Sequence, residues 1–117
     1  MADKVTIYHN PRCSKSRQTM ELLHSNAVQP DVVEYLNSPP DVATLESLLT
    51  MLGMQPRQLM RKTEAEYKEN KLDNDSLTRQ QLIEAMVKFP KLIERPIVVS
   101  NGKAAIGRPP ETVLEIL

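Results

Sequence analysis

The sequence predicts a single α/β domain with a helical insertion in its middle, and three observations lead to this prediction. Strand-like, helical and strand-like segments follow one another at the start of the chain. A hairpin motif, Asn101 followed by Gly102, stands near its end. The stretch between them has helical patterns and no strand of comparable quality. At 117 residues the chain is long enough for one core and too short for two ordinary domains.

The first third of the chain predicts a β-α-β unit. Residues 4–9, KVTIYH, are rich in β-branched and aromatic residues and stop at a turn signal, Asn10 and Pro11, so we expect them to form the first strand. Residues 15–26 contain good helix formers whose apolar positions are three and four apart. Residues 31–36, DVVEYL, are then the second strand.

Residues 41–92 form the predicted helical insertion. Its first helix begins at Asp41, after two prolines, and ends at Gly53, which stands where a C-terminal cap belongs. A later helix is indicated by a second apolar repeat at spacings of three and four, made by Leu82, Ile83, Met86 and Phe89.

The last part of the chain completes a recognisable element order. Two short strands flank the Asn101 and Gly102 turn within residues 95–110, and residues 110–117, PETVLEIL, form an amphipathic helix that packs on the sheet. This is the order of a thioredoxin-like (glutaredoxin-like) fold with an insertion between the second and third strands. The lone cysteine, Cys13, supports it, because it lies in the turn where such proteins keep a reactive thiol.

Composition excludes several classes of function. The chain has 15 basic and 15 acidic residues, and the basic ones are scattered, so we expect no nucleic-acid partner. No apolar run approaches the roughly 20 residues that span a bilayer, and no signal peptide is seen, so we expect a cytoplasmic protein without a membrane partner. One cysteine and two histidines predict neither an internal disulfide nor a metal site, and no bound cofactor is expected.

Cys13 lies in the segment YHNPRCSKSR, which has the properties of a reactive thiol site. Thiols react as thiolates, so a reactive cysteine needs positive charge or a helix N-terminus to lower its pKa. If the helix begins just after Cys13, backbone N–H groups face the sulfur, and the hydroxyls of Ser14 and Ser16 can add donors. An inert buried cysteine is the alternative, but its polar neighbours do not suit a core. The nearby cationic side chains are Arg12, Lys15 and Arg17.

His9 and Ser16 have roles that depend on this thiol. His9 can favour the thiolate as an imidazolium, or move a proton as a neutral imidazole, or simply end a strand; the sequence leaves these open. Ser16 stands where a dithiol protein has its second cysteine, so it cannot form a disulfide. It can donate a hydrogen bond to the thiolate or an adduct, or only bond the backbone of the first helical turn.

Three arginines stand out because their neighbours are apolar or turn-forming: Arg61, Arg95 and Arg108. Arg95 precedes Pro96 in the loop that lies beside the cysteine turn in a thioredoxin-like fold, so Pro96 is a candidate cis-proline. Gly107 leaves space around Arg108. Guanidinium groups bind tetrahedral oxyanions through paired hydrogen bonds, so arginines around a thiolate predict an oxyanion substrate; scattered surface arginines are the alternative.

Four segments, IYHNPRCSKSR, LMRK, ERPIVV and GRPPE, together resemble the glutaredoxin-dependent arsenate reductase family, in order and over essentially the whole chain. The resemblance implies that Cys13 is the nucleophile, that the three arginines bind arsenate, and that His9 and Ser16 support the thiolate. It also implies a covalent thio-arsenate adduct on Cys13, which glutathione attacks as co-substrate before glutaredoxin completes reduction to arsenite. A second cysteine is then not needed.

Within this family the chain is similar to the shorter chromosomal, YfgD-like branch. It ends at LEIL, and it has Arg12 and Lys15 where the resistance-operon enzymes have small or neutral residues. These two positions are candidates for tuning which oxyanion is accepted. Two other functions stay open: an Spx-like regulator that binds RNA polymerase, and a monothiol oxidoreductase that acts on glutathione mixed disulfides.

Overall fold

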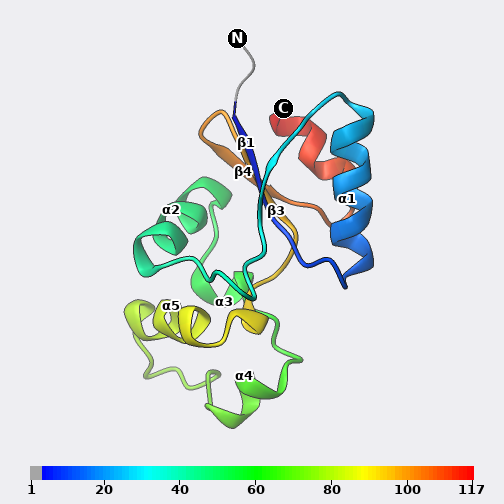
Figure 1. Cartoon of the computed structure of the whole chain (residues 1–117). Helices are drawn as coiled ribbons and strands as arrows, with labels where there is room; N and C mark the ends of the chain where they lie inside the picture. Colours follow the sequence, from blue (N-terminus) through cyan, green and yellow to red (C-terminus); the bar gives the residue numbers. More distant parts are fainter. Residues whose placement is uncertain (1–3) are drawn as a thin grey trace. The chain divides into compact units, whose positions relative to one another are not determined.

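The computed structural model describes residues 4–117, so the first three residues of the predicted domain lie outside it. The chain divides into two units (Figure 1). The first contains the described residues up to Ser38 together with Arg95–Leu117, and the second is Pro39–Glu94. The bounds of the second unit are within two residues of those of the predicted insertion, 41–92. The single-domain organisation stays a prediction.

The first unit is built on a four-stranded sheet with the strand order β2-β1-β3-β4. The central strand β1 is parallel to β2 and antiparallel to β3, and β3 pairs with β4 as a hairpin. This topology, with a helix after β1, confirms the predicted thioredoxin-like fold. The strands are β1 (Val5–Tyr8), β2 (Asp31–Val33), β3 (Ile97–Ser100) and β4 (Lys103–Ile106).

The predicted hairpin is confirmed around its two turn residues. Asn101 and Gly102 have φ angles of 56° and 73°, the left-handed conformation that the tight turn between β3 and β4 requires. Ser100 and Lys103 face each other across this turn.

Two helices of the first unit pack against one face of the sheet. They are α1 (Ser14–Ser25), one residue offset from the predicted 15–26, and the 3₁₀ helix η2 (Pro110–Ile116), which lie side by side in Figure 1. The C-terminal segment therefore packs on the sheet as predicted. The shared core consists of alternate strand residues and one side chain from each helix: Val5, Ile7, Val98, Ala105, Leu23 and Val113.

The second strand is shorter than the predicted 31–36, and the prediction is wrong after Val33. The chain turns there, because the carbonyl oxygen of Glu34 accepts hydrogen bonds from the N–H groups of Asn37 and Ser38, at 3.0 and 2.9 Å. A carbonyl used in a local turn cannot continue the ladder with β1. Tyr35 is nevertheless buried, so the apolar pattern reflected burial and not strand pairing.

The second unit is helical, as its pattern predicted. Asp41 caps α2 by accepting the Thr44 N–H at 2.8 Å, and Gly53 ends that helix with a φ of 67°. Apolar side chains of α2 and α5 are buried where the two helices contact each other. The helices are α2 (Val42–Leu52), α3 (Pro56–Leu59), α4 (Ala65–Glu69), α5 (Arg79–Lys88) and the 3₁₀ helix η1 (Pro90–Leu92).

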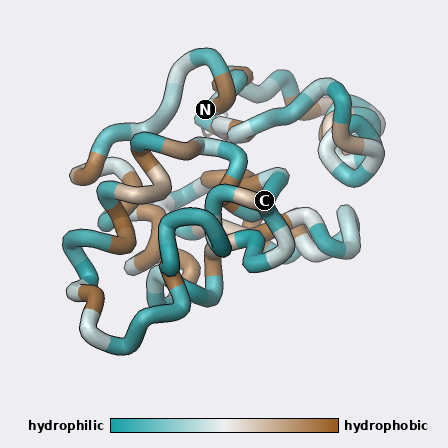
Figure 2. The backbone as a smooth tube through the Cα atoms, turned by 90° about the horizontal axis from the view of Figure 1, so that it is seen from below, coloured by the Kyte–Doolittle hydropathy of each residue, from teal (hydrophilic) through white to brown (hydrophobic). Residues whose placement is uncertain are grey.

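Hydrophobic residues occur in short stretches between hydrophilic ones along the backbone (Figure 2). Within residues 4–117, no helix has the length and apolar character needed to cross a membrane.

Candidate functional site

Cys13 stands at the start of α1, held by a turn on one side and by the helix on the other. Its N–H donates to the carbonyl of Asn10 at 3.0 Å, and its own carbonyl accepts from the Arg17 N–H at 3.0 Å. The Asn10 side chain closes the turn by accepting the Arg12 N–H, also at 3.0 Å. No side chain caps the first turn of α1. The free N–H groups of that turn are therefore available to the sulfur, as predicted.

The surroundings of Cys13 lower the pKa of its thiol. Burial, which leaves the residue 8% exposed, acts in the opposite direction and raises the pKa. That effect is outweighed by the backbone N–H groups of Ser16 and Lys15 and by the positive charges of Arg95 and Arg108. The thiolate is thus stabilised by main-chain donors and two guanidinium groups, which is the property expected of a nucleophile.

The Arg108 side chain directly contacts the sulfur. Its Nη2 lies 3.6 Å from Cys13 Sγ, and its Nε donates to the carbonyl of Arg95 at 2.8 Å. The second bond fixes the guanidinium against the loop that precedes β3. Pro96 is cis, which confirms the prediction, and the bond between Arg108 and Pro109 is also cis, which was not predicted.

Gly107 is needed for close packing, and the expectation that it leaves space around Arg108 stays a prediction. A Cβ atom at this position would lie 2.5 Å from Thr19 Oγ1 and 2.9 Å from Pro96 Cγ. Both distances are shorter than real Cβ contacts. The glycine therefore lets the end of β4 approach α1 and the Pro96 loop. This approach determines the backbone position of Arg108, the next residue.

His9 and Ser16 form a buried pair beside the cysteine turn. His9 Nδ1 lies 2.5 Å from Ser16 Oγ, and that oxygen also accepts the Asn10 N–H at 3.0 Å. Burial lowers the pKa of His9, with a smaller opposing effect from Glu34 and a smaller reinforcing one from Arg17. Because the ordinary histidine pKa is about 6.5, His9 is mainly the neutral imidazole at pH 7.

In the described part of the chain, the hydroxyls of Ser14 and Ser16 make no hydrogen bond to the Cys13 sulfur. Ser16 uses its hydroxyl on His9 and Asn10, while its contact with the thiol comes from its backbone N–H. Ser14 is exposed, and its hydroxyl has no hydrogen bond in the described part of the chain. A role for Ser16 at a covalent adduct stays a prediction.

Five of the six predicted site residues lie in the first unit of the chain, and the sixth, Arg61, lies in the second. His9, Arg95 and Arg108 lie in the first unit with the thiol. Arg61 lies in the second unit, where its N–H donates to Leu92 at 2.7 Å and its guanidinium pairs with Glu64 at 3.2 Å. A shared role for Arg61 with the thiol stays a prediction.

Comparisons with known proteins show the family to which this chain belongs. The ArsC family model matches residues 8–116. This chain belongs to the ArsC family. It is 61% identical to the Escherichia coli protein YfgD over 118 residues, which covers 100% of this chain and 99% of YfgD.

Two relatives of this ArsC-family chain are named arsenate reductases. One, from Haemophilus influenzae, is 49% identical over 114 residues, covering 97% of this chain and 98% of that protein. The other, from Vibrio cholerae, has a solved structure that matches with a TM-score of 0.97 and 51% identity, over 100% of both chains. The family and the thioredoxin-like fold therefore agree with the resemblance found in the sequence.

Arg12 and Lys15 are separate from the cations that act on the thiol of this ArsC-family chain. The side-chain charges that lower the pKa of Cys13 are those of Arg95 and Arg108. Arg12 lines a hollow of about 360 Å³ at the cysteine turn, together with His9, Asn10, Pro11, Glu34, Leu36 and Asn37. The sequence predicted a turn at Asn10 and Pro11, but it did not predict that the Asn10 side chain accepts the Arg12 N–H, or that Glu34 lines the hollow. No pattern in the sequence pointed to Glu34.

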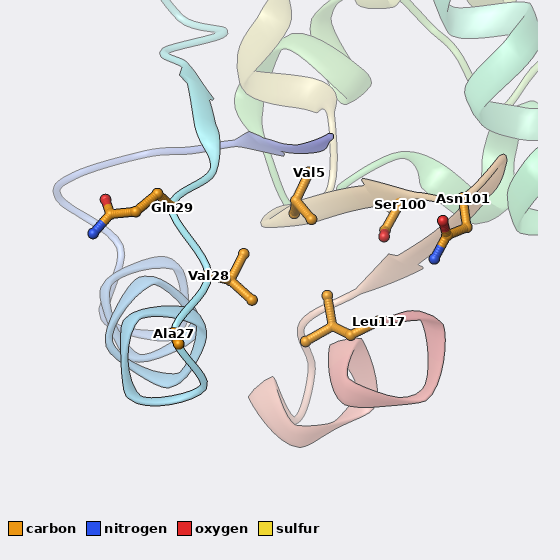
Figure 3. Close-up of a pocket in the computed structure, with 7 residues that line it drawn as sticks. All are labelled: Val5, Ala27, Val28, Gln29, Ser100, Asn101 and Leu117. Carbon is orange, nitrogen blue, oxygen red and sulfur yellow. The ribbon is translucent and has the colours of Figure 1, made fainter. Parts of the chain in front are cut away.

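A second hollow lies where β1 begins, among residues remote from the thiol. Its volume is about 410 Å³, and its lining residues are Val5, Ala27, Val28, Gln29, Ser100, Asn101 and Leu117 (Figure 3). None of these side chains is ionisable, and none is a thiol. The hollow at the cysteine turn, in contrast, is lined by the ionisable side chains of His9, Arg12 and Glu34.

Proposed function

We propose that this ArsC-family chain is an arsenate reductase that uses Cys13 as its nucleophile, glutathione as co-substrate and glutaredoxin as the final reductant. The observation that carries the proposal is the buried Cys13 thiol with a lowered pKa and the Arg108 guanidinium 3.6 Å from its sulfur. The arsenate reductase names of the close relatives support the choice of substrate.

In the first step the Cys13 thiolate attacks the arsenic atom of arsenate. A sulfur–arsenic bond forms, and one arsenate oxygen leaves as water after taking up a proton, so the arsenic stays in its +5 state. Thiolate and arsenate are both anions, and cations are needed to bring them together. Arg95 and Arg108 serve this purpose, because guanidinium groups pair with tetrahedral oxyanions through charge-assisted hydrogen bonds.

In the second step glutathione supplies the thiol that this chain lacks. Its sulfur bonds to the Cys13 sulfur, and the arsenic leaves with the electron pair of the sulfur–arsenic bond as arsenite. The two thiols are oxidised together to a mixed disulfide, and the arsenic is reduced by two electrons. Glutaredoxin then removes glutathione from Cys13 by thiol–disulfide exchange. We place this chemistry in the cytoplasm, where thiols are kept reduced.

Arsenite formation with glutathione and glutaredoxin present is the direct test. We expect Cys13→Ser to lose at least about a thousandfold in rate, because a hydroxyl cannot replace a stabilised thiolate as nucleophile. Ser100→Ala, in the hollow without ionisable side chains, is the control and should keep the wild-type rate. Equal rates for wild type and Cys13→Ser would remove Cys13 from the mechanism. Omitting glutathione or glutaredoxin in turn tests each donor.

A monothiol oxidoreductase is the second candidate, since the lowered pKa of Cys13 and the absence of a second cysteine also suit exchange with glutathione mixed disulfides. Release of glutathione from a glutathionylated peptide, without arsenite formation in the assay above, would favour this function.

A further inference from the structure

We propose that the hollow at the cysteine turn binds the free amino-acid end of glutathione, with Arg12 taking its α-carboxylate and Glu34 its α-ammonium group. This inference rests on the proposed use of glutathione and names the residues that hold it.

Arg12 and Glu34 line the same hollow and do not pair with each other. Both residues are exposed. Among residues 4–117, the Arg12 guanidinium makes no hydrogen bond or ion pair, and the Glu34 carboxylate has one long hydrogen bond, 3.4 Å, from the Asn37 amide. Other surface charges of the chain do find partners, such as Arg79 with Glu46 at 3.0 Å. Two opposite charges are thus left available on the walls of one hollow.

Such a pair fits a zwitterion better than an oxyanion. The γ-glutamyl end of glutathione has an ammonium and a carboxylate group on one carbon atom, so it needs one anion and one cation at close range. Arsenate needs cations alone, and Glu34 would repel it. The side-chain amides of Asn10 and Asn37 add neutral hydrogen-bonding groups to the same walls, and half-exposed Leu36 offers apolar surface for the glutamyl methylenes.

The hollow also adjoins the turn that carries Cys13. Arg12 is the neighbour of Cys13, and consecutive Cα atoms are about 3.8 Å apart. The Cys13 N–H is bonded to Asn10, another lining residue. The cysteinyl residue of glutathione directly follows its γ-glutamyl end, so holding that end in the hollow directs the glutathione sulfur to the Cys13 turn.

Two groups of cations then serve two substrates. Arg95 and Arg108 lower the pKa of the Cys13 thiol and bind its oxyanion, whereas Arg12 lines the hollow. In this interpretation Arg12 contributes to the selection of the thiol co-substrate, in place of the oxyanion choice that the sequence suggested for it.

The test uses a reaction that contains no arsenate. The Cys13 thiolate attacks one sulfur of oxidised glutathione, forms the mixed disulfide and releases one glutathione thiolate, which takes up a proton. The rate of mixed-disulfide formation is followed by intact-protein mass spectrometry. Oxidised cysteinylglycine, which lacks the γ-glutamyl end, and oxidised 2-mercaptoethanol, which is uncharged, are measured in parallel to normalise for the reactivity of the thiol.

We expect the wild type to prefer oxidised glutathione over oxidised cysteinylglycine, and Arg12→Ala and Glu34→Gln each to reduce that preference about threefold to fivefold, as for exposed charge pairs. Neither variant should change the rate with oxidised 2-mercaptoethanol. Lys103→Ala and Glu115→Gln, exposed charges remote from the hollow, are the matched controls and should behave as wild type.

The direction of the rate change in Glu34→Gln distinguishes the proposal from a simple effect of net charge. Oxidised glutathione is an anion, so if only net charge mattered, removal of a carboxylate would speed mixed-disulfide formation. The proposal requires the reaction to become slower. A faster reaction, or no preference for glutathione in the wild type, overturns the inference. Loss of the preference in both variants supports it even if no arsenite is ever formed, in which case the arsenate reductase proposal alone fails.

Discussion

The two hollows at the ends of β1 have similar volumes, about 360 and 410 Å³, yet only the first is lined by ionisable side chains. One follows the last residues of β1 and contains a histidine, an arginine and a glutamate next to the thiol turn. The other surrounds Val5, the first residue of the strand, with neutral side chains (Figure 3). Size therefore does not identify the site in this molecule.

The contrast arises from what each end of the strand is connected to. After β1 the chain enters a turn and then the N-terminus of α1, where unpaired N–H groups favour negative charge. The opposite end meets the end of α1, the hairpin turn and the C-terminal segment, whose backbone groups are used in turns and whose side chains are mostly apolar. A reactive thiol is stabilised at one end and would find no such support at the other.

The largest effect expected from breaking this contrast is that of Arg108→Ala. It removes the guanidinium 3.6 Å from the sulfur, so the pKa of Cys13 should rise and arsenite formation should fall about tenfold to a hundredfold, as for a charge-assisted contact. Thiolate absorbance against pH measures the first, and the coupled assay measures the second. Lys103→Ala, which removes a cation at the hairpin end, should leave both as in the wild type; equal effects of the two substitutions would contradict a local role for Arg108.

Two glycine substitutions compare packing at the two ends. Gly107→Ala places a methyl group 2.5 Å from Thr19 Oγ1 and should reduce the free energy of unfolding by about 1 to 3 kcal/mol, while also displacing Arg108 and slowing turnover. Gly102→Ala meets no atom within 4 Å but keeps a φ of 73°, and should cost about 1 kcal/mol without loss of activity. Urea denaturation measures both.

The double variant Thr19→Ala with Gly107→Ala gives the control for that comparison. Removal of the Thr19 hydroxyl relieves the shorter of the two close contacts, so part of the lost stability should return. No recovery at all would mean that overpacking against Thr19 is not the cause.

The smallest effect expected is a pH dependence of stability from His9. Its pKa is lowered in the folded protein, mainly by burial, so below about 6.5 the unfolded chain binds the proton more readily than the folded one. Stability should therefore fall as the pH decreases from about 6.5 through the lowered pKa of His9. The urea midpoints at pH 7.5 and pH 5 should differ less in His9→Gln than in wild type. His24→Gln, an exposed histidine at the far end of α1, should retain the wild-type difference.

Local features of the fold could be predicted from the sequence, and non-local ones could not. The Asn101 and Gly102 turn and the Asp41 and Gly53 caps depend on the conformations of single residues, and all were confirmed. The early end of β2 depends on the hydrogen bonds that the Glu34 carbonyl accepts from the turn that follows. The residue pattern of the strand does not indicate these bonds.

The same division holds for the candidate site. The position of Cys13 at a helix N-terminus follows from adjacent residues and was predictable. Its contact with Arg108, 95 residues later, followed only from the chemistry of oxyanion binding and the family resemblance. The neutral state of His9, the hydroxyl partners of Ser16 and the tight packing of Gly107 depend on burial by sequence-distant segments, so residue type alone could not indicate them.

The absence of a side-chain cap on α1 has a consequence for the state of the helix during turnover. Most helices begin with a serine, threonine, aspartate or asparagine whose oxygen satisfies the first N–H groups, a contact of about 1 kcal/mol. Here that position is Cys13, and no side-chain cap is present. The quality of the cap therefore changes with the charge on the sulfur: it is poor for the neutral thiol and good for the thiolate or an anionic adduct. The first turn of α1 is completed by the chemistry itself, so each charged state of Cys13 should also be a more firmly folded state of the helix that carries it.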